Sequence, residues 1–253
     1  MKIVRFTNGF VTEYGVIDGD MIQALSASPF EEYKVLHKFY RPSDVKILPP
    51  CQPSKIVALG VNYKSHGEEM SHSLPEEPLI FLKPPTAVIG HNDTIIYPPS
   101  SKRVDYEGEL GVVISQEAHN IKKEKTKNYI LGYTCVNDVT ARDLQAKDKQ
   151  WTRAKGFDTF APIGPCIETE LDPSDLALET RLNGEVKQKT RTSELIFDVF
   201  HLVSFISEVM TLLPGDVIAT GTTAGIGPMK PGDIVEVEIE GIGVLRNHVG
   251  MPD

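Results

Sequence analysis

The hydrophobic positions of this 253-residue chain fall mainly into short runs whose length and spacing are typical of β-strands. Near the N-terminus, two such runs surround Asn8-Gly9, a pair that favours a hairpin turn. Segment 48–55 follows with three prolines, and proline both fixes φ and removes a hydrogen-bond donor. We therefore expect a small N-terminal β domain (residues 1–50) followed by a main domain (51–253).

One long helix is predicted at 192–213, where apolar residues recur every three or four positions. Thr192 or Ser193 would cap this helix, and Pro214-Gly215 would end it. Shorter apolar runs predict strands at 2–6, 11–17, 56–59, 79–82, 95–97, 110–115, 129–136, 217–220, 234–239 and 244–249. Many strands and one long helix indicate a β-rich α+β fold rather than a doubly wound sheet.

Charge and cysteine content narrow the class of protein. Asp plus Glu total 35 against 26 Lys plus Arg, a net charge of −9, so the surface would repel a nucleic-acid backbone. A membrane span needs about 18 consecutive apolar residues, which the chain lacks, and its first residues do not form a signal peptide. Cys51, Cys135 and Cys166 form no C-x-x-C pair, which is typical of free thiols in a reducing compartment. We expect a soluble cytoplasmic protein that binds neither nucleic acid nor membrane.

Acidic residues alternate in the run VDYEGELGVVI. On an extended strand Asp105, Glu107 and Glu109 would share one face, and bare carboxylates at that spacing repel one another. A later β run ends beside Asp138, which adds a further carboxylate. An all-oxygen set of this kind favours a hard divalent cation, Mg²⁺ or Mn²⁺. An acidic strand facing solvent, with lysine neighbours, is the alternative interpretation.

Three further segments carry candidate chemistry. His66 and Glu69 are three residues apart, so one helical turn would place a carboxylate beside an imidazole and form a general-base pair. Arg142 suits a carboxylate clamp, and Lys155 could place positive charge beside an anionic intermediate. The glycine-rich loop 221–228 lacks the sequence of a nucleotide-binding loop, but its backbone amides could hold a carboxylate. Solvated side chains, surface ion pairs and a plain turn are the respective alternatives.

Taken in order, these segments resemble the fumarylacetoacetate hydrolase superfamily, with the similarity extending over residues 55–249. The matching blocks are GVNYxxHxxE, LIFLKPPTAVIG, YPPSSKRVDYEGELGVVI, GYTCVNDVTARDLQ, KGFDTFAPIGP, LNGEVKQ and GDVIATGTTAGIGPMKPGD. The chain is most similar to the compact bacterial members, which have a short N-terminal β extension. The resemblance implies a mixed β-roll or barrel around a metal site, a mobile lid over residues 62–77, and a homodimer.

The resemblance also implies roles for particular residues. It assigns Glu107, Glu109 and Asp138 as ligands for Mg²⁺ or Mn²⁺, His66 and Glu69 as a catalytic pair on the lid, Lys155 as a lysine near the metal, and Arg142, Gln145 and Thr222 as substrate-binding residues. Thr223 departs from the proline that many members have at this position.

The activity implied is that of a metal-dependent enzyme acting on 2-oxo or 2-hydroxy-dienoic acids through a metal-stabilised enolate. The first expectation is a 2-hydroxyhepta-2,4-diene-1,7-dioate isomerase or decarboxylase of aromatic catabolism. Hydrolysis of an acylpyruvate such as fumarylpyruvate, or decarboxylation of oxaloacetate, would use the same residues. A catalytically silent metabolite-binding protein is the alternative from a different class.

Overall fold

The computed structural model describes residues 1–69 and 75–252. Its strands are β1 (Lys2–Thr7), β2 (Thr12–Asp18), β3 (Met21–Leu25), β4 (Val35–Tyr40), β5 (Lys46–Leu48), β6 (Ile56–Leu59), β7 (Ile80–Lys83), β8 (Val88–Ile89), β9 (Thr94–Ile96), β10 (Val104–Tyr106), β11 (Gly108–Ile114), β12 (Ile130–Asn137), β13 (Thr140–Ala141), β14 (Ala161–Glu168), β15 (Ala177–Leu182), β16 (Glu185–Arg191), β17 (Val217–Ala219), β18 (Gly227–Met229), β19 (Ile234–Ile239) and β20 (Gly243–Gly250). Its α-helices are α1 (Lys64–Glu69), α2 (Arg142–Asp148), α3 (Thr152–Lys155) and α4 (Val199–Val209). Short 3₁₀ helices lie at Pro42–Asp44, Pro85–Ala87, Lys123–Tyr129, Pro173–Asp175 and Thr192–Glu194. The fold is α+β and strand-rich, which confirms the predicted class.

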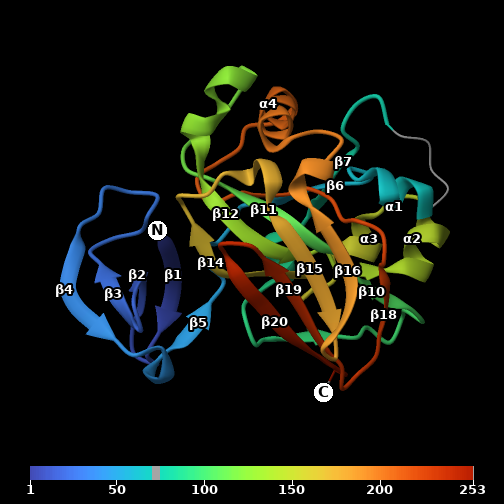
Figure 1. Ribbon diagram of the computed structural model, residues 1–253. Helices are drawn as coiled ribbons and strands as arrows, with labels where there is room; N and C mark the ends of the chain where they lie inside the picture. Colours follow the sequence, from blue (N-terminus) through green and yellow to red (C-terminus); the bar gives the residue numbers. More distant parts are fainter. Residues whose placement is uncertain (70–74, 253) are drawn as a thin grey trace.

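The largest sheet runs through both parts of the chain. Its strand order is β4-β3-β2-β1-β14-β12-β11-β17-β6-β7, with β5 beside β1 and β8 beside β14. The N-terminal hairpin, β1 and β2, is confirmed and joins this sheet through the pairing of Lys2 and Ile3 with Glu168 and Ile167 of β14. Figure 1 shows the N-terminal strands, in blue, at one end of the molecule. The N-terminal unit thus extends the main sheet.

A second sheet covers one face of the first. Its order is β16-β15-β19-β20-β9, and Figure 1 shows β15 and β16 in front of β11 and β12. Apolar side chains from both sheets form the core between them, including Leu110 and Cys135 from one side and Leu178 and Val237 from the other. A small third sheet, β13-β10-β18, lies near α2 and α3. Within the described residues, no helix is both long and apolar enough to cross a bilayer.

The helix predicted at 192–213 is wrong in its extent. Helix α4 covers only Val199–Val209, and Asp198 caps it by accepting a hydrogen bond from the His201 backbone N–H at 2.8 Å. Before it, Thr192–Glu194 form a 3₁₀ helix, and Leu195 is extended and forms a β-bridge with Tyr63. Long-range pairing therefore replaces the first turns that the apolar spacing predicts.

The proline-rich segment 48–55 is held in place by one carboxylate. Asp216 is fully buried and accepts hydrogen bonds from the backbone N–H (2.9 Å) and hydroxyl (2.7 Å) of Ser54. It also pairs with Lys55 Nζ at 2.5 Å. Asp216 follows Gly215, whose φ of 84° suits the predicted Pro-Gly turn. The turn before β17 thereby fixes the segment that leads into β6.

Replacing Asp216 by Ala should lower the free energy of unfolding by about 3 kcal/mol, because the variant removes a buried carboxylate that accepts several hydrogen bonds and leaves the Ser54 donors and the Lys55 charge without this partner. Urea denaturation measures this change. Asp175→Ala is the control, since Asp175 forms an exposed ion pair with Arg191 and should contribute at most about 1 kcal/mol. Equal losses in the two variants would contradict the anchoring role of Asp216.

Candidate active site

Three buried carboxylates lie within reach of a single ion. Glu107, Glu109 and Asp138 each offer an oxygen, and these oxygens all lie within 4.8 Å of one another. The three residues are 4%, 0% and 0% exposed. The structure brings together the three residues that the family resemblance assigned as metal ligands. A set of ligands made only of oxygen atoms suits Mg²⁺ or Mn²⁺.

The backbone assembles this group where one strand ends and another begins. Strand β10 ends at Tyr106 in the small sheet, whereas β11 begins at Gly108 in the main sheet, so Glu107 lies between them. The Glu107 N–H donates to Asn137 Oδ1 at 2.9 Å, and the Asp138 N–H donates to the Glu107 carbonyl at 2.8 Å. These reciprocal bonds hold the end of β12 against the β10–β11 junction.

The single extended strand predicted for residues 105–109 is wrong. Asp105 belongs to β10 and accepts hydrogen bonds from Arg103 Nε and Arg142 Nε, each at 2.9 Å. The chain changes sheets at Glu107, and Arg142 contacts both the Asp105 and the Glu107 carboxylate. Asp105 therefore binds arginines and is not a member of the three-carboxylate group.

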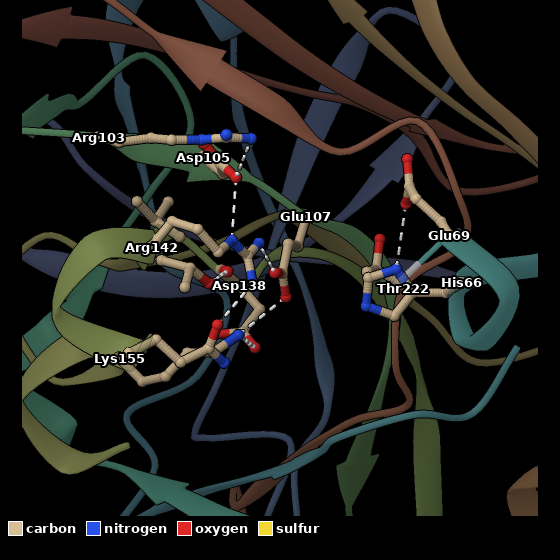
Figure 2. A network of polar contacts seen from close by, with 12 residues as sticks. His66, Glu69, Arg103, Asp105, Glu107, Asp138, Arg142, Lys155 and Thr222 are labelled. Atoms are coloured by element: carbon tan, nitrogen blue, oxygen red, sulfur yellow. Dashed lines mark hydrogen bonds and ion pairs between the residues drawn. The ribbon is translucent and has the colours of Figure 1, made fainter. Parts of the chain in front are cut away.

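Buried cations compensate the carboxylates, as the network in Figure 2 shows. Lys155 Nζ donates to Glu107 Oε2 (2.8 Å) and Asp138 Oδ2 (2.5 Å), Lys83 Nζ donates to Asp138 Oδ1 (2.5 Å), and Arg142 pairs with Glu107. Burial alone would lower the pKa of Lys155, but the carboxylates of Asp138 and Glu107 raise it overall. Burial alone would raise the pKa of Glu107, yet Lys155 and Arg142 hold it well below its usual range. Both groups are therefore charged.

Glu109 differs from its neighbours because no cation contacts it in the described part of the chain. Its Oε2 accepts a hydrogen bond from the Gly221 N–H at 2.8 Å, whereas its buried Oε1 has no partner. Burial raises the pKa of Glu109 well above its usual value, and the charges of Asp138 and Glu107 add to this effect. A buried oxygen without a donor, beside two other carboxylates, fits a divalent cation.

A cavity of about 380 Å³ opens beside this group. Its polar lining consists of His66, Glu107, Arg142, Gln145 and Lys155, and its other lining residues are Leu59, Gly60, Val61, Phe81, Ala146 and Trp151. The Phe81 and Trp151 rings meet edge to face, with their centroids 5.2 Å apart. The cavity can therefore hold a small organic acid in contact with both charged and apolar side chains.

His66 and Glu69 lie on α1 and face each other across one turn. His66 Nδ1 is 3.4 Å from Glu69 Oε2, and Glu69 Oε1 accepts a hydrogen bond from the Gly225 N–H at 3.0 Å. Figure 2 shows this pair to one side of the network that contains Glu107 and Lys155. An imidazole oriented by a carboxylate at the edge of a cavity can accept or donate a proton.

The predicted substrate-binding residues differ in their surroundings. Arg142 Nη1 donates to Gln145 Oε1 at 2.7 Å, and both residues line the cavity. The Thr222 hydroxyl is engaged elsewhere, because it donates to the Gly108 carbonyl at 3.0 Å and accepts from Gln188 Nε2 at 2.8 Å. Arg142 and Gln145 can thus reach a bound molecule directly, whereas the Thr222 side chain binds the protein itself.

The predicted lid over residues 62–77 is described in part, since residues 70–74 lie outside the described residues. At the start of this segment, Asn62 is buried and its Nδ2 donates to the Thr220 carbonyl at 2.7 Å. Asn62 Oδ1 also accepts from the Phe197 N–H at 2.8 Å. Asn62 is therefore anchored to the body of the protein, and the mobility predicted from residue 62 onward does not apply there.

Two family profiles match adjacent parts of the sequence. The profile described as "Fumarylacetoacetate (FAA) hydrolase C-terminal" matches residues 55–250, and that described as "Rv2993c-like, N-terminal" matches residues 1–50. The chain belongs to the fumarylacetoacetate hydrolase family. The sequence-based resemblance to this family is thereby confirmed.

Similar proteins of this family have several named activities. The crystal structure of 2-hydroxyhepta-2,4-diene-1,7-dioate isomerase from Mycobacterium marinum is 43% identical and has a TM-score of 0.93, covering 99% of this chain and 98% of that one. Maleylpyruvate hydrolase from Sphingobium sp. SYK-6, in complex with manganese(II) and pyruvate, is 28% identical with a TM-score of 0.84 and full coverage of both chains. The mitochondrial oxaloacetate tautomerase Fahd2a of Rattus norvegicus is 39% identical over 80% of this chain and 68% of its own. The fumarylacetoacetate hydrolase family thus includes isomerases, hydrolases and tautomerases.

Sequence reasoning missed three residues of this candidate site. Lys83 is fully buried against Asp138, and the only signal was a lysine ending the apolar run of LIFLKPP. Trp151, the one tryptophan, lines the cavity, which no local pattern indicates. Gln188, in the LNGEVKQ block, contacts the backbone between Glu107 and Glu109.

Replacing Glu109 by Gln should stabilise the metal-free protein at neutral and alkaline pH. Because burial raises the folded-state pKa of Glu109 above 4.5, the folded protein binds more protons than the unfolded one and loses stability as pH rises through that range. Thermal unfolding of metal-free protein should therefore show a gain for Glu109→Gln that is larger at about pH 8 than at about pH 4. Mn²⁺ should raise the melting temperature of the wild type but not of the variant.

The exposed Glu208→Gln serves as control, with no change expected in either measurement. Stabilisation of Glu109→Gln by Mn²⁺ to the same extent as the wild type would exclude Glu109 as a ligand.

Proposed function

We propose that this protein is a divalent-metal-dependent isomerase of 2-oxo acids and their enol forms. The observation that carries this proposal is the three-carboxylate group beside a cavity that also contains the Lys155 ammonium and the His66 imidazole. Among possible substrates we favour 2-hydroxyhepta-2,4-diene-1,7-dioate, since a similar full-length structure from Mycobacterium marinum has that name. Decarboxylation of such a diacid is a further reaction that the same residues would support.

The charged residues of the cavity can stabilise an anion that develops during the reaction. Glu107, Glu109 and Asp138 would hold Mg²⁺ or Mn²⁺, which when bound supplies positive charge that stabilises an enolate. Lys155 adds a fixed positive charge that is already desolvated and held by two carboxylates, so little reorganisation is needed when charge develops. Arg142 and Gln145 line the same cavity and can orient a substrate carboxylate.

His66 is the group that we assign to proton transfer. The contact between its Nδ1 and Glu69 leaves the other ring nitrogen to exchange a proton with substrate. In an isomerisation, His66 would take the proton from the enol hydroxyl and return one to a carbon of the conjugated system. The proton count is unchanged, so the reaction needs no oxidant, reductant or added water.

Hydrolysis of an acylpyruvate is the second candidate function. It is favoured by the complete His66–Glu69 pair, which could activate a water molecule instead of exchanging a substrate proton. The similarity to maleylpyruvate hydrolase supports this candidate. Tautomerisation or decarboxylation of oxaloacetate would need the same metal site. The similarity to the rat oxaloacetate tautomerase is the reason to include oxaloacetate among the substrates tested.

A substrate panel assayed with Mg²⁺ and with Mn²⁺ separates these candidates. We expect isomerisation of 2-hydroxyhepta-2,4-diene-1,7-dioate, followed by ultraviolet absorbance, to be the fastest reaction, and EDTA to abolish it. Turnover of acylpyruvates alone would identify a hydrolase instead. Turnover of oxaloacetate alone would identify a tautomerase or decarboxylase, according to the product. Binding of oxalate in a titration calorimeter without turnover of any substrate would support a silent binding protein.

His66→Ala should lower the turnover number by about 10²-fold, the usual size of a general-base contribution. Binding of Mn²⁺, measured by titration calorimetry, should stay within about twofold of the wild type because His66 is outside the carboxylate group. His37→Ala is the matched control, since His37 is exposed on β4 and should leave turnover unchanged. Unchanged turnover of every substrate in His66→Ala would refute its assigned role.

A further inference from the structure

A single residue, Gly108, separates Glu107 and Glu109 along the chain. Gly108 lies between Glu107 and Glu109, where the chain passes from β10 to β11. A Cβ atom at this position would lie 2.0 Å from Thr180 Oγ1, so a side chain would not fit. The direction of the Glu107 and Glu109 side chains therefore depends on how tightly the backbone of Gly108 is held.

Gln188 holds this backbone from the second sheet. Its side chain is 1% exposed and its Oε1 accepts a hydrogen bond from the Gly108 N–H at 2.9 Å. Its Nε2 donates to the Thr222 hydroxyl at 2.8 Å and to the Thr223 carbonyl at 2.9 Å. The acceptor and both donors of the amide thus have partners.

The contacts of Gln188 close a ring of hydrogen bonds. The Thr222 hydroxyl, which accepts from Gln188, donates in turn to the Gly108 carbonyl at 3.0 Å. Both polar groups of Gly108 are thereby fixed by side chains that are themselves linked. The adjacent Gly221 N–H donates to Glu109 Oε2 at 2.8 Å, so the same loop orients one carboxylate directly.

We infer that Gln188 is a positioning residue that fixes Glu107 and Glu109 in the geometry needed to bind a divalent cation. This inference rests on the metal site proposed above. A glutamine that only stabilised the packing of β16 could bond to any strand of the opposing sheet. Gln188 instead bonds to the peptide unit between two carboxylates and to the loop that contacts the second one. Partners of this kind orient ligands and tune metal affinity.

The same loop also contacts α1. Thr223 Oγ1 lies 3.0 Å from Ser65 Oγ, and the Gly225 N–H donates to Glu69. Gln188 therefore contacts α1, which carries His66, only indirectly, through Thr223 and Ser65. Because its direct contact is with Gly108, replacing Gln188 should change metal affinity first.

The test compares Mn²⁺ binding with metal-free stability. Gln188→Met has a side chain of similar length without the amide, and we expect it to weaken Mn²⁺ binding about tenfold in titration calorimetry. Thr190→Val, two residues along β16, is the matched control because Thr190 is buried and its hydroxyl, within the described residues, bonds only to the Arg191 carbonyl and the Glu194 carboxylate. This control should bind Mn²⁺ as the wild type does, whatever its melting temperature.

Thr222→Val breaks the ring from its other side and keeps the inference testable if Gln188→Met does not fold. It should weaken Mn²⁺ binding by a similar factor, and the double variant should be little weaker than either single variant, because the ring is broken once. A Gln188→Met protein with a lower melting temperature but Mn²⁺ affinity within twofold of the wild type would overturn the inference. Failure of the wild type itself to bind Mn²⁺ would refute the metal site, and this inference with it.

Discussion

Burial of three carboxylates in one place demands positive charge close by, and much of the architecture around the cavity supplies it. Lys155, Lys83 and Arg142 come from α3, β7 and α2, and each contacts Glu107 or Asp138. An unpaired buried carboxylate would be strongly destabilising, so these elements are held near β11 by charge as well as by packing. Glu109 keeps one oxygen without a partner among the described residues, which leaves a place for a cation from outside the chain.

The same charged groups share the cavity with apolar side chains. Lys155, Arg142 and Glu107 line it together with Phe81 and Trp151, and Lys155 Nζ lies 5.0 Å from the centroid of the Phe81 ring. A 2-oxo acid likewise combines a charged end with a carbon chain. The cavity therefore offers such a molecule both charged and apolar contacts.

The loop after β17 links parts of the site that are distant in sequence. Within a few residues it contacts Glu109 through Gly221, Gly108 and Gln188 through Thr222, and α1 through Gly225. The loop lacks the sequence of a nucleotide-binding motif, and its backbone groups serve carboxylates of the protein itself. One segment thereby contacts both the three-carboxylate group and the His66–Glu69 pair.

The sequence by itself determined the local features of this protein. Apolar runs located ten of the twenty strands in the described residues, the hairpin around Asn8-Gly9 and the α+β class. They could do so because burial of one face of a strand produces a periodic pattern within a few consecutive residues. Ordered motifs identified the family, and the spacing of His66 and Glu69 placed them on one turn. These are properties of neighbours along the chain.

Only the tertiary structure decided which distant residues meet. Lys83 and Asp138 are in contact although 55 residues separate them along the chain, and Gln188 and Gly108 although 80 do. The periodic pattern of apolar residues predicts no contact over such separations. Asp105 pairs with Arg103 and Arg142 and is outside the carboxylate group, and α4 begins only at Val199, after Leu195 pairs with Tyr63. In each case a long-range hydrogen bond or ion pair outweighed a local preference, because backbone groups and charges inside the protein must find partners wherever the fold brings them.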